Sequence, residues 1–338
     1  MTQDWRSHKE RSTPMMLRLI VTLAMKLRRS FVRPLLYPIV AYFLITGGPA
    51  RKASRDYLRR TIGHEPTWRD QWRHFFAFAS CTLDRIFMLS NRFDSLDIEV
   101  HRPENVRALV ARFPGCLLFV AHFGSPESLR VIGVNKRGLP LSILLDRNHG
   151  RMLTELLEQV NPELANSVID ASERGPGLVL RLKEVLEEGR MVGIMADRAL
   201  ASERSVEVDF LGGRARLPVG PWQLASALKV PVIVGFGCYV GDNRYAAHFE
   251  LFAEKVTLPR LERDAAIKQL AQRFAKRLEY YAHLAPYNWF NFYDYWPTTP
   301  APSNSLDPSD ELADANSSDG QRSPHTVGAK AAHDAAAR

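Results

Sequence analysis

The sequence is poor in the residues that build disulfide frameworks and metal centres. Only three cysteines occur among 338 residues, and Cys81, Cys116 and Cys238 are far apart and mostly lie in apolar runs. A small, odd set of scattered thiols argues against a disulfide frame, and no Cys or His spacing matches a zinc site. We therefore predict buried, reduced thiols, no bound metal and no cofactor.

Several common catalytic signatures are also missing. The chain has no Gly-x-Ser-x-Gly turn, which exposes a nucleophilic serine in α/β-hydrolases. It has no Walker phosphate loop and no dinucleotide-binding fingerprint. A cleavable signal peptide is not expected either, because the first apolar run starts late and no small-x-small cleavage site follows it. These absences disfavour serine hydrolases of that type, nucleotide-driven enzymes and nicotinamide or flavin oxidoreductases.

Acidic residues are scarce at the N-terminus. Residues 1–60 contain 13 Lys and Arg against 3 Asp and Glu, whereas the whole chain contains 45 and 37. The remaining residues thus hold 32 cations and 34 anions, so the basic character belongs to the N-terminal segment and not to the rest of the chain. These cations lie among aliphatic residues, a mixture that argues against a nucleic-acid-binding arm.

The same segment contains an uncharged apolar stretch, residues 34–50, with arginines on both sides. A spanning helix needs about 20 apolar residues, and Pro34, Pro38 and Gly47 are among the residues that interrupt this stretch. We predict helices that lie in, or dip into, the cytoplasmic leaflet, with their basic flanks on anionic headgroups. The alternative is a buried core helix with a solvated basic flank.

Apolar strands and amphipathic helices alternate downstream of this segment. We expect the following strands: residues 115–121, 140–145, 167–170, 191–196 and 230–240. Helices are expected between them, and a long one over residues 261–283. Such alternation predicts an α/β fold with a mostly parallel central sheet covered by helices, preceded by N-terminal membrane-associating helices.

Three regions follow from these patterns. Residues 1–60 form the predicted membrane-anchoring segment, and residues 61–298 the catalytic domain. Residues 299–338 are rich in Ala, Ser, Pro and Asp and contain no aromatic residue. A segment of this composition cannot bury enough apolar surface to fold, so we predict a disordered tail.

One predicted strand end carries a candidate catalytic base. His122 directly follows the strand over residues 115–121, at the sheet edge where open α/β sheets bind ligands. Gly124 allows a sharp turn, and Ser125 with the following proline suits a helix start. Glu127 then lies in the first helical turn and is able to reach back to His122. A carboxylate on one ring nitrogen would leave the other free to act as a base.

The same pattern has a purely structural explanation. His122 would then only end a strand, and Glu127 would be an acid favoured by the positive end of the helix dipole. In the catalytic interpretation, the backbone N–H groups of Gly124 and Ser125 bind the oxyanion that develops on the substrate.

Other candidate residues follow two further predicted strands. Arg147 comes after residues 140–145, where a guanidinium can bind a phosphate or stabilise an oxyanion, unless it is a surface residue paired with an acid. Asn148 adds a hydrogen-bonding group or caps the loop. Asp197 and Arg198 come after residues 191–196 and either orient a substrate or hold a loop.

An aromatic block near the C-terminus carries no candidate catalytic residue. Residues 287–296 contain seven aromatic side chains. Two alternative positions are a membrane interface, where Trp and Tyr collect, and the wall of an acyl tunnel. We expect them to pack against the domain.

The run His122-Phe-Gly-Ser-Pro-Glu127 resembles the His-x4-Asp/Glu block of the lysophospholipid acyltransferase superfamily. It is most similar to the branch of the late lipid A acyltransferases. Blocks around Arg147, Asp197 and residues 208–221 follow in the family's order. The C-terminal aromatic block resembles a sub-branch associated with aryl-polyene-type pigment lipids. Ser125 and the following proline replace a common Asn-Trp pair, which leaves the acceptor open.

This resemblance implies an O-acyltransferase on the cytoplasmic face of the bacterial inner membrane. The donor would be an acyl carrier protein or coenzyme A thioester, and the acceptor a lipid hydroxyl. His122, oriented by Glu127, would deprotonate that hydroxyl and later protonate the leaving thiol. Replacement of His122 by alanine is then expected to abolish transfer, and replacement of Glu127 nearly so.

Two other functions remain open from the sequence. A lipid or thioester hydrolase would use the same pair of residues on water and release fatty acid. A non-catalytic lipid-binding or assembly protein would tolerate replacement of both His122 and Glu127 without loss of function.

Overall fold

The computed structural model describes residues 21–132, 140–146, 151–172, 175–199 and 203–296. A seven-stranded sheet forms its centre, with the strand order β1-β9-β8-β2-β5-β3-β4. The strands are β1 (Asp97–Val100), β2 (Cys116–Val120), β3 (Leu141–Leu145), β4 (Val168–Asp170), β5 (Met191–Met195), β8 (Val232–Gly241) and β9 (Arg244–Ala253). A separate antiparallel hairpin consists of β6 (Ser205–Phe210) and β7 (Gly213–Pro218).

Five neighbouring strands of the sheet are parallel: β8, β2, β5, β3 and β4. Strand β9 runs antiparallel to β8, and β1 is parallel to β9. The prediction of a mostly parallel central sheet is confirmed. Strand β2 lies in the middle and is buried at every position, which is why it reads as a continuous apolar run without polar alternation.

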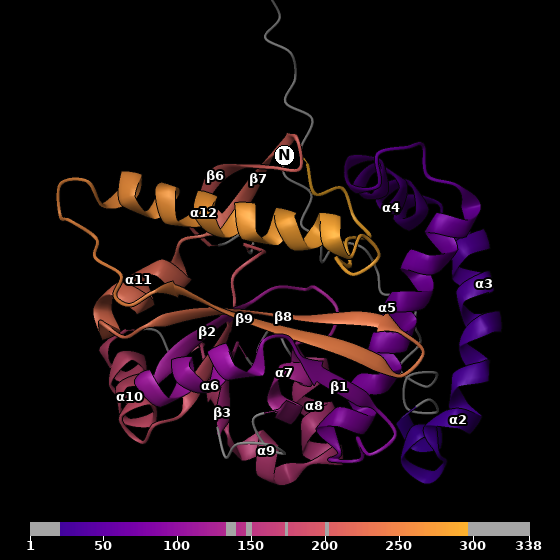
Figure 1. The fold of residues 1–338 in the computed structure, drawn as a ribbon, viewed down its shortest axis with the longest axis horizontal. Coiled ribbons are helices and arrows are strands. Elements are labelled where there is room, and N and C mark those ends of the chain that lie inside the picture. Colours follow the sequence, from indigo (N-terminus) through magenta and orange to yellow (C-terminus); the bar gives the residue numbers. More distant parts are fainter. Residues whose placement is uncertain (1–20, 133–139, 147–150, 173–174, 200–202, 297–338) are drawn as a thin grey trace, which may run out of the picture. The chain divides into compact units, whose positions relative to one another are not determined.

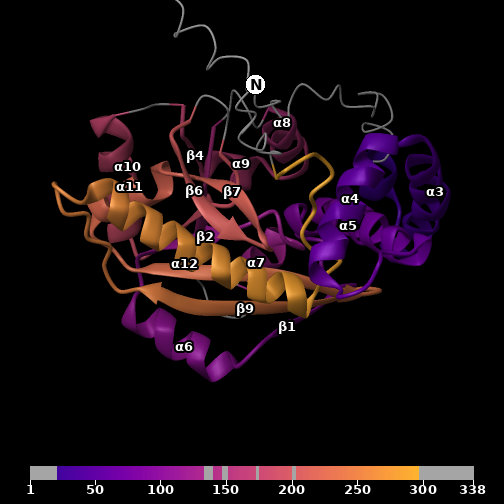
Figure 2. The ribbon, with the colours of Figure 1, turned by 90° about the horizontal axis from the view of Figure 1, so that it is seen from above.

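Helices cover both faces of the sheet (Figure 1). One face packs against α10 (Pro176–Glu187), α11 (Gly220–Leu228) and α12 (Arg263–Leu284), whose apolar residues join the largest core cluster. The other face packs against α7 (Pro126–Ile132) and α6 (Pro103–Arg112), which lie below β8 and β9 in Figure 1. Figure 2 shows α6 to one side of β9. Two further helices, α8 (Arg151–Val160) and α9 (Pro162–Asn166), connect β3 to β4.

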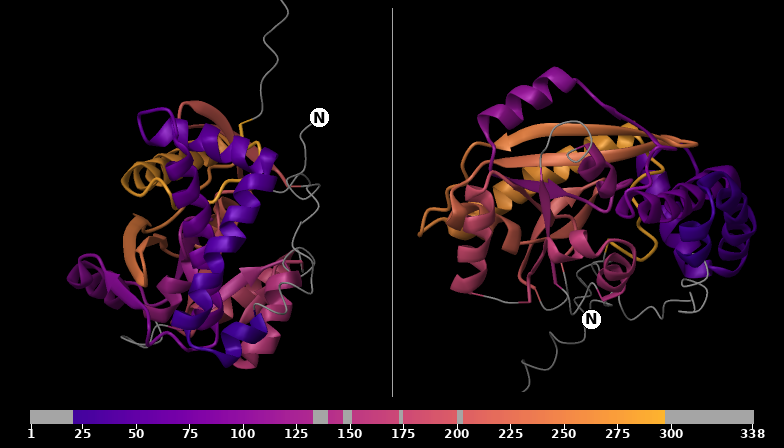
Figure 3. Two further views of the ribbon diagram at one scale, coloured as in Figure 1. Left: turned by 90° about the vertical axis from the view of Figure 1, so that its right-hand side faces the viewer. Right: turned by 90° about the horizontal axis from the view of Figure 1, so that it is seen from below.

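The N-terminal helices lie together at one end of the sheet (Figure 3). They are α2 (Arg29–Val32), the 3-10 turn η2 (Arg33–Leu35), α3 (Leu36–Thr46), α4 (Gly48–Thr61) and α5 (Trp68–Leu89). A capping box between Thr67 and Asp70 begins α5. Helices α3 and α4 both contact α5, with Val40 and Leu44 buried against Phe75. Residues 21–61 therefore pack on the rest of the chain through one side, while Phe31, Tyr42 and Ile45 are largely exposed.

A buried ion pair joins the first of these helices to the fold. Arg29 donates to both carboxylate oxygens of Asp84, at 2.6 and 2.9 Å, and also to the carbonyl of Asp242 in the β8–β9 turn. The hydroxyl of Tyr245 donates to Asp84 at 2.7 Å. Helix α2, helix α5 and strand β9 are thus linked through one carboxylate.

The length and apolar character of the N-terminal helices bear on the predicted membrane association. Within the described residues, no single helix has both the length and the apolar character needed to cross a bilayer. The segments Arg29–Thr46 and Gly48–Thr61 meet those criteria only when taken together, and they are bent by 94° relative to each other. The predicted tail, residues 299–338, lies outside the described residues.

Candidate active site

The candidate site lies at the carboxyl ends of two neighbouring parallel strands. Val120 of β2 is paired with Met195 of β5. His122 and Asp197 each follow these partners by two residues, so the register of the sheet brings them side by side. The edge formed by the carboxyl ends of parallel strands is where open α/β sheets bind ligands.

Asp197 is the carboxylate that contacts the His122 ring. His122 Nδ1 lies 2.9 Å from Asp197 Oδ1, and the His122 backbone N–H donates to Oδ2 at 3.1 Å. The indole N–H of Trp289 donates to the same Oδ2 at 3.3 Å. Asp197 is fully buried. Because an ionised carboxylate only accepts hydrogen bonds, Nδ1 carries the proton in this pair.

The surroundings set the charge states of both residues. Burial alone would raise the pKa of Asp197, but His122, its hydrogen bonds and the charge of Arg198 outweigh that effect and lower the pKa to about 2. Burial lowers the pKa of His122, and the attraction of Asp197 only partly opposes this. Near neutral pH the site therefore holds an ionised aspartate beside a neutral imidazole.

His122 Nε2 is the group that remains available for chemistry. No hydrogen bond to this atom is found within the described parts of the chain, and 39% of the His122 side chain is exposed. An imidazole with Nδ1–H held by a carboxylate and Nε2 open to substrate is suited to general base catalysis.

Glu127 lies close by but has different partners. Its carboxylate accepts a hydrogen bond from Ser125 Oγ at 2.9 Å and forms an ion pair with Arg85 Nε at 2.7 Å. The structure thus pairs the His122 ring with Asp197 and places Glu127 at the turn that follows. We predicted that Glu127 would orient the His122 ring, but the structure gives that contact to Asp197. The short α7 directs the Glu127 side chain toward Arg85 of α5 instead.

The backbone N–H groups expected to face a substrate are already used within the protein. Gly124 N–H donates to the carbonyl of Asn288 at 2.7 Å, and Ser125 N–H donates to the carbonyl of Gly237 at 2.8 Å. Gly124 has a φ of +56°, and a Cβ there would lie 1.9 Å from the Gly237 oxygen. The glycine is required for this close approach, and the turn offers neither N–H group to an oxyanion.

Arg198 fixes the chain around Asp197. Its side chain is 10% exposed, lies 3.6 Å from Asp197 Oδ2 and donates to the carbonyl of Phe290 at 2.6 Å. The guanidinium also lies over the ring of Tyr293. Of the two roles considered for Arg198, holding a loop agrees with these contacts.

The C-terminal aromatic segment, residues 287–296, builds one wall of the site. Its backbone contacts the His122 turn, since Phe290 N–H donates to the His122 carbonyl at 3.1 Å and Phe123 forms a β-bridge with Trp289. The Tyr295 hydroxyl donates to the Asp197 carbonyl at 2.9 Å. Sequence reasoning assigned this segment to packing and missed these contacts, because no spacing pattern links it to residues so distant in the chain.

Two predicted site residues, Arg147 and Asn148, lie outside the described residues. Within the described ranges, no cluster of three or more His, Cys, Asp or Glu side chains is placed to hold a metal ion. Asp146, which follows β3, is the last described residue before Arg147.

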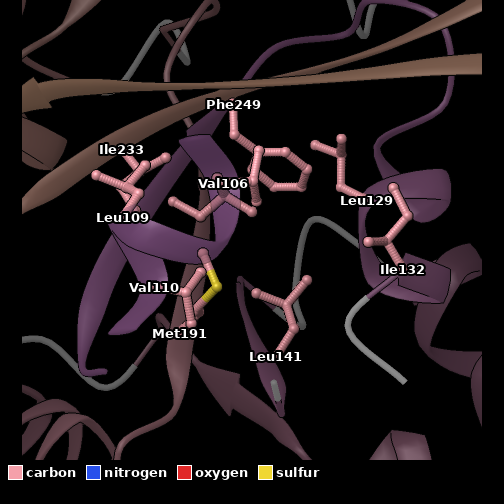
Figure 4. Close-up of a pocket in the computed structure, with 10 residues that line it drawn as sticks. Val106, Leu109, Val110, Leu129, Ile132, Leu141, Met191, Ile233 and Phe249 are labelled. Atoms are coloured by element: carbon pink, nitrogen blue, oxygen red, sulfur yellow. The ribbon is translucent and has the colours of Figure 1, made fainter. Parts of the chain in front are cut away.

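An enclosed apolar cavity lies away from this edge. Side chains of α6 and of α7 face each other across it below β8 and β9 (Figure 4). Its free space is about 20 Å³, and its lining is aliphatic apart from Met191 and Phe249. Leu118 in that lining precedes His122 by four residues, or about 13 Å of strand. The cavity is too small and too remote to hold the groups that react at His122.

Comparison with known proteins gives consistent matches. The family described as bacterial lipid A biosynthesis acyltransferase matches residues 70–298. A phosphatidylinositol mannoside acyltransferase of Mycolicibacterium smegmatis is 24% identical over 257 residues, which cover 75% of this chain and 76% of that protein. A protein of the same name from Mycobacterium tuberculosis is 27% identical over 199 residues, covering 54% of this chain and 59% of that protein.

Proposed function

Because the chain belongs to the bacterial lipid A biosynthesis acyltransferase family, we propose that it transfers a fatty acyl group from an acyl thioester to a hydroxyl of a lipid or glycolipid through His122. It is an acyltransferase, as its family and its named relatives are. The two relatives are named for a phosphatidylinositol mannoside, which is a glycolipid, and this supports an acceptor of that class.

The observation that carries the mechanism is the hydrogen bond between His122 Nδ1 and Asp197, with Nε2 left open. Nε2 takes the proton of the acceptor hydroxyl while its oxygen attacks the thioester carbonyl. A C–O bond forms, the C–S bond breaks, and His122 returns the proton to the departing thiolate. Asp197 stabilises the imidazolium formed between these two proton transfers.

Glu127 has a supporting role in this proposal. Through Ser125 and Arg85 it fixes the turn that carries His122. The side chain of Arg147 is proposed to stabilise the oxyanion, since the N–H groups of Gly124 and Ser125 are bonded within the protein. The donor is proposed to be an acyl carrier protein or coenzyme A thioester.

We further propose that the N-terminal helices dock on the membrane. Large apolar side chains are exposed on this part of the surface, including Phe31 at 69%, Tyr42 at 58% and Ile45 at 70%. Exposed cations flank them in sequence, among them Arg28 and Lys52. Apolar groups in the headgroup region with cations on anionic lipid are typical of interfacial helices. The cytoplasmic face of the bacterial inner membrane is the proposed location.

The proposed function is tested by following the acyl group. Membranes containing wild type or His122→Ala are incubated with ¹³C-palmitoyl-coenzyme A or ¹³C-palmitoyl-acyl carrier protein, and the lipids are analysed by mass spectrometry. We expect label in a lipid with wild type only, and the mass of that lipid identifies the acceptor, including any pigment lipid. A folded His122→Ala protein that still transfers the label would overturn the proposal.

Two other outcomes contradict the proposed function in distinct ways. Label that appears only as free palmitate, and depends on His122, would identify a hydrolase. Unchanged lipid composition with both donors, together with full complementation of a deletion strain by His122→Ala, would identify a non-catalytic lipid-binding protein. Asp84→Asn serves as the matched control, because it changes a buried aspartate outside the site and is expected to keep activity in the folded fraction.

A further inference from the structure

We propose that Trp289 is a positioning residue of the reaction, whose indole N–H holds the Asp197 carboxylate in register with His122. This inference rests on the proposed role of His122 as the base. Trp289 is fully buried in the C-terminal aromatic segment, and its ring nitrogen lies 3.3 Å from Asp197 Oδ2. It reaches the site from a part of the chain 92 residues away.

The hydrogen bond from Trp289 completes the set that fixes the carboxylate plane. Asp197 Oδ2 accepts from the indole and from the His122 backbone N–H, so Oδ1 is left directed at His122 Nδ1. Without the indole, Oδ2 keeps the His122 backbone N–H and the Arg198 guanidinium at 3.6 Å, so the carboxylate plane is held less tightly against rotation about its Cβ–Cγ bond. The terminal torsion of aspartate is broad, so such rotation is opposed mainly by hydrogen bonds.

Trp289 is itself held from the opposite side. His74 Nε2 lies 3.0 Å from the Trp289 carbonyl oxygen, and His74 Nδ1 lies 2.8 Å from Ser54 Oγ. His74 is fully buried, and Tyr57 packs edge-on against the Trp289 indole. A chain of contacts therefore runs from the side chains of α4 and α5 through Trp289 to Asp197 and His122. Through these contacts, the helices at the end of the sheet support the catalytic pair.

The alternative is that Trp289 only fills space. Its ring packs against Phe210 and Tyr295, and phenylalanine would preserve part of that packing. A packing role would not couple the indole N–H to the titration of His122. A positioning role does, because the carboxylate that loses this donor is less well solvated and attracts the imidazolium more strongly.

The test follows His122 directly by NMR. The full-length protein, labelled at histidine ¹³Cε1 and held in dodecyl maltoside micelles, is titrated from pH 4.5 to 8.5. His122 is assigned from the signal that disappears in His122→Ala. We expect Trp289→Phe to raise the pKa of His122 by about half a pH unit and to lower the turnover number roughly tenfold, with the Michaelis constants unchanged.

Tyr295→Phe is the matched control. It removes a hydrogen bond from the same segment to the main-chain carbonyl of Asp197 and leaves the carboxylate untouched. The charged groups that act on His122 are Asp197, Arg198 and Arg85, and neither substitution changes them. An equal shift in both variants, or no shift in either, would overturn the proposal.

A second variant covers the case in which Trp289→Phe fails to fold. Incorporation of β-(3-benzothienyl)alanine at position 289 keeps the shape of the ring and removes only the N–H donor. The same increase in the pKa of His122 is expected, and its absence counts against the proposal. Since the NMR readout needs no substrate, a His122→Ala protein that still transfers acyl groups would overturn the proposed function and leave this result standing.

Discussion

Two buried aspartates at different places in the molecule show how the side chain that a carboxylate contacts decides whether it serves stability or catalysis. Asp197 and Asp84 are both fully buried, and each accepts three hydrogen bonds or more. Asp84 faces Arg29. Burial alone would lower the pKa of Arg29, but the hydrogen bond and the charge of Asp84 raise it, so Arg29 keeps its positive charge. Asp197 faces His122, an imidazole that is able to take up and release a proton and whose pKa is lowered by burial.

The difference teaches that burial of a carboxylate does not by itself mark an active site. The partner of Asp84 cannot release a proton under any condition in which the protein is folded, and its pair lies between α2, α5 and β9. The partner of Asp197 can exchange a proton and is 39% exposed at a sheet edge. A permanent pair stabilises the fold, whereas a pair that exchanges a proton can support catalysis.

The largest effect is expected from Asp197→Asn. The amide cannot stabilise the imidazolium and favours the wrong tautomer of His122, so we expect transfer to fall by about 10²- to 10⁴-fold. The measurement is the initial rate of labelled lipid formation by protein whose fold is checked by circular dichroism. Asp84→Asn is the companion variant, and a loss of turnover as large as that of Asp197→Asn would remove the contrast between the two sites.

The next largest effect is on stability, at the other aspartate. Arg29→Met leaves Asp84 buried without its cation, and we expect a loss of about 3–5 kcal/mol in the free energy of unfolding. Urea denaturation measures this loss. Adding Asp84→Leu to the same protein should restore much of it, because an apolar pair carries no uncompensated charge. A double variant no more stable than Arg29→Met would contradict this account of the pair.

A smaller, pH-dependent effect is expected at His74, the buried histidine behind Trp289. Burial lowers its pKa from the usual 6.5 to about 4, so the folded state needs its neutral form. Its contribution is present above pH 6.5 and is lost as the pH falls from 6.5 to 4, by up to about 3 kcal/mol. Denaturation at pH 7, 5.5 and 4.5 should show a steeper decline for wild type than for His74→Gln. Parallel declines would argue against this source of acid sensitivity.

The smallest change concerns the pH dependence of the reaction. The base must be neutral, and the pKa of His122 is lowered by burial, so the acid limb of kcat/KM should lie below pH 6.5. In Asp197→Asn the lost anion should move the limb of the residual activity to still lower pH. Rates between pH 5 and 9 provide the measurement, and an acid limb above pH 7 in wild type would contradict the assignment of His122 as base.

Much of the fold followed from local sequence patterns. The strands around residues 115–121, 191–196 and 230–240 are continuous apolar runs bounded by turn residues, and the structure places β2, β5 and β8 there. The start of α7 after Ser125 was also predicted correctly, because capping depends on neighbouring residues. Composition alone did not indicate that one side of residues 21–61 packs on the fold while Phe31, Tyr42 and Ile45 stay exposed on the other.

The site was predicted only in part, because its residues are far apart in the sequence. His122 was recognised from its position after a strand, and Asp197 was named as a candidate, but Glu127 was chosen as the partner because it is close in sequence. The contact with Asp197 depends on the pairing of Val120 with Met195, which spans 75 residues. Trp289 depends on where the chain returns after α12, and no local pattern encodes that path.

The sequence by itself determined which strands and helices form and which strand end carries a histidine, because apolar periodicity, turns and caps act over a few neighbouring residues. Tertiary structure alone decided which carboxylate meets that histidine, which N–H groups are already bonded and which indole closes the site. These features arise from sheet register and from contacts between segments 75 to 215 residues apart, whose geometry is fixed only when the whole chain packs.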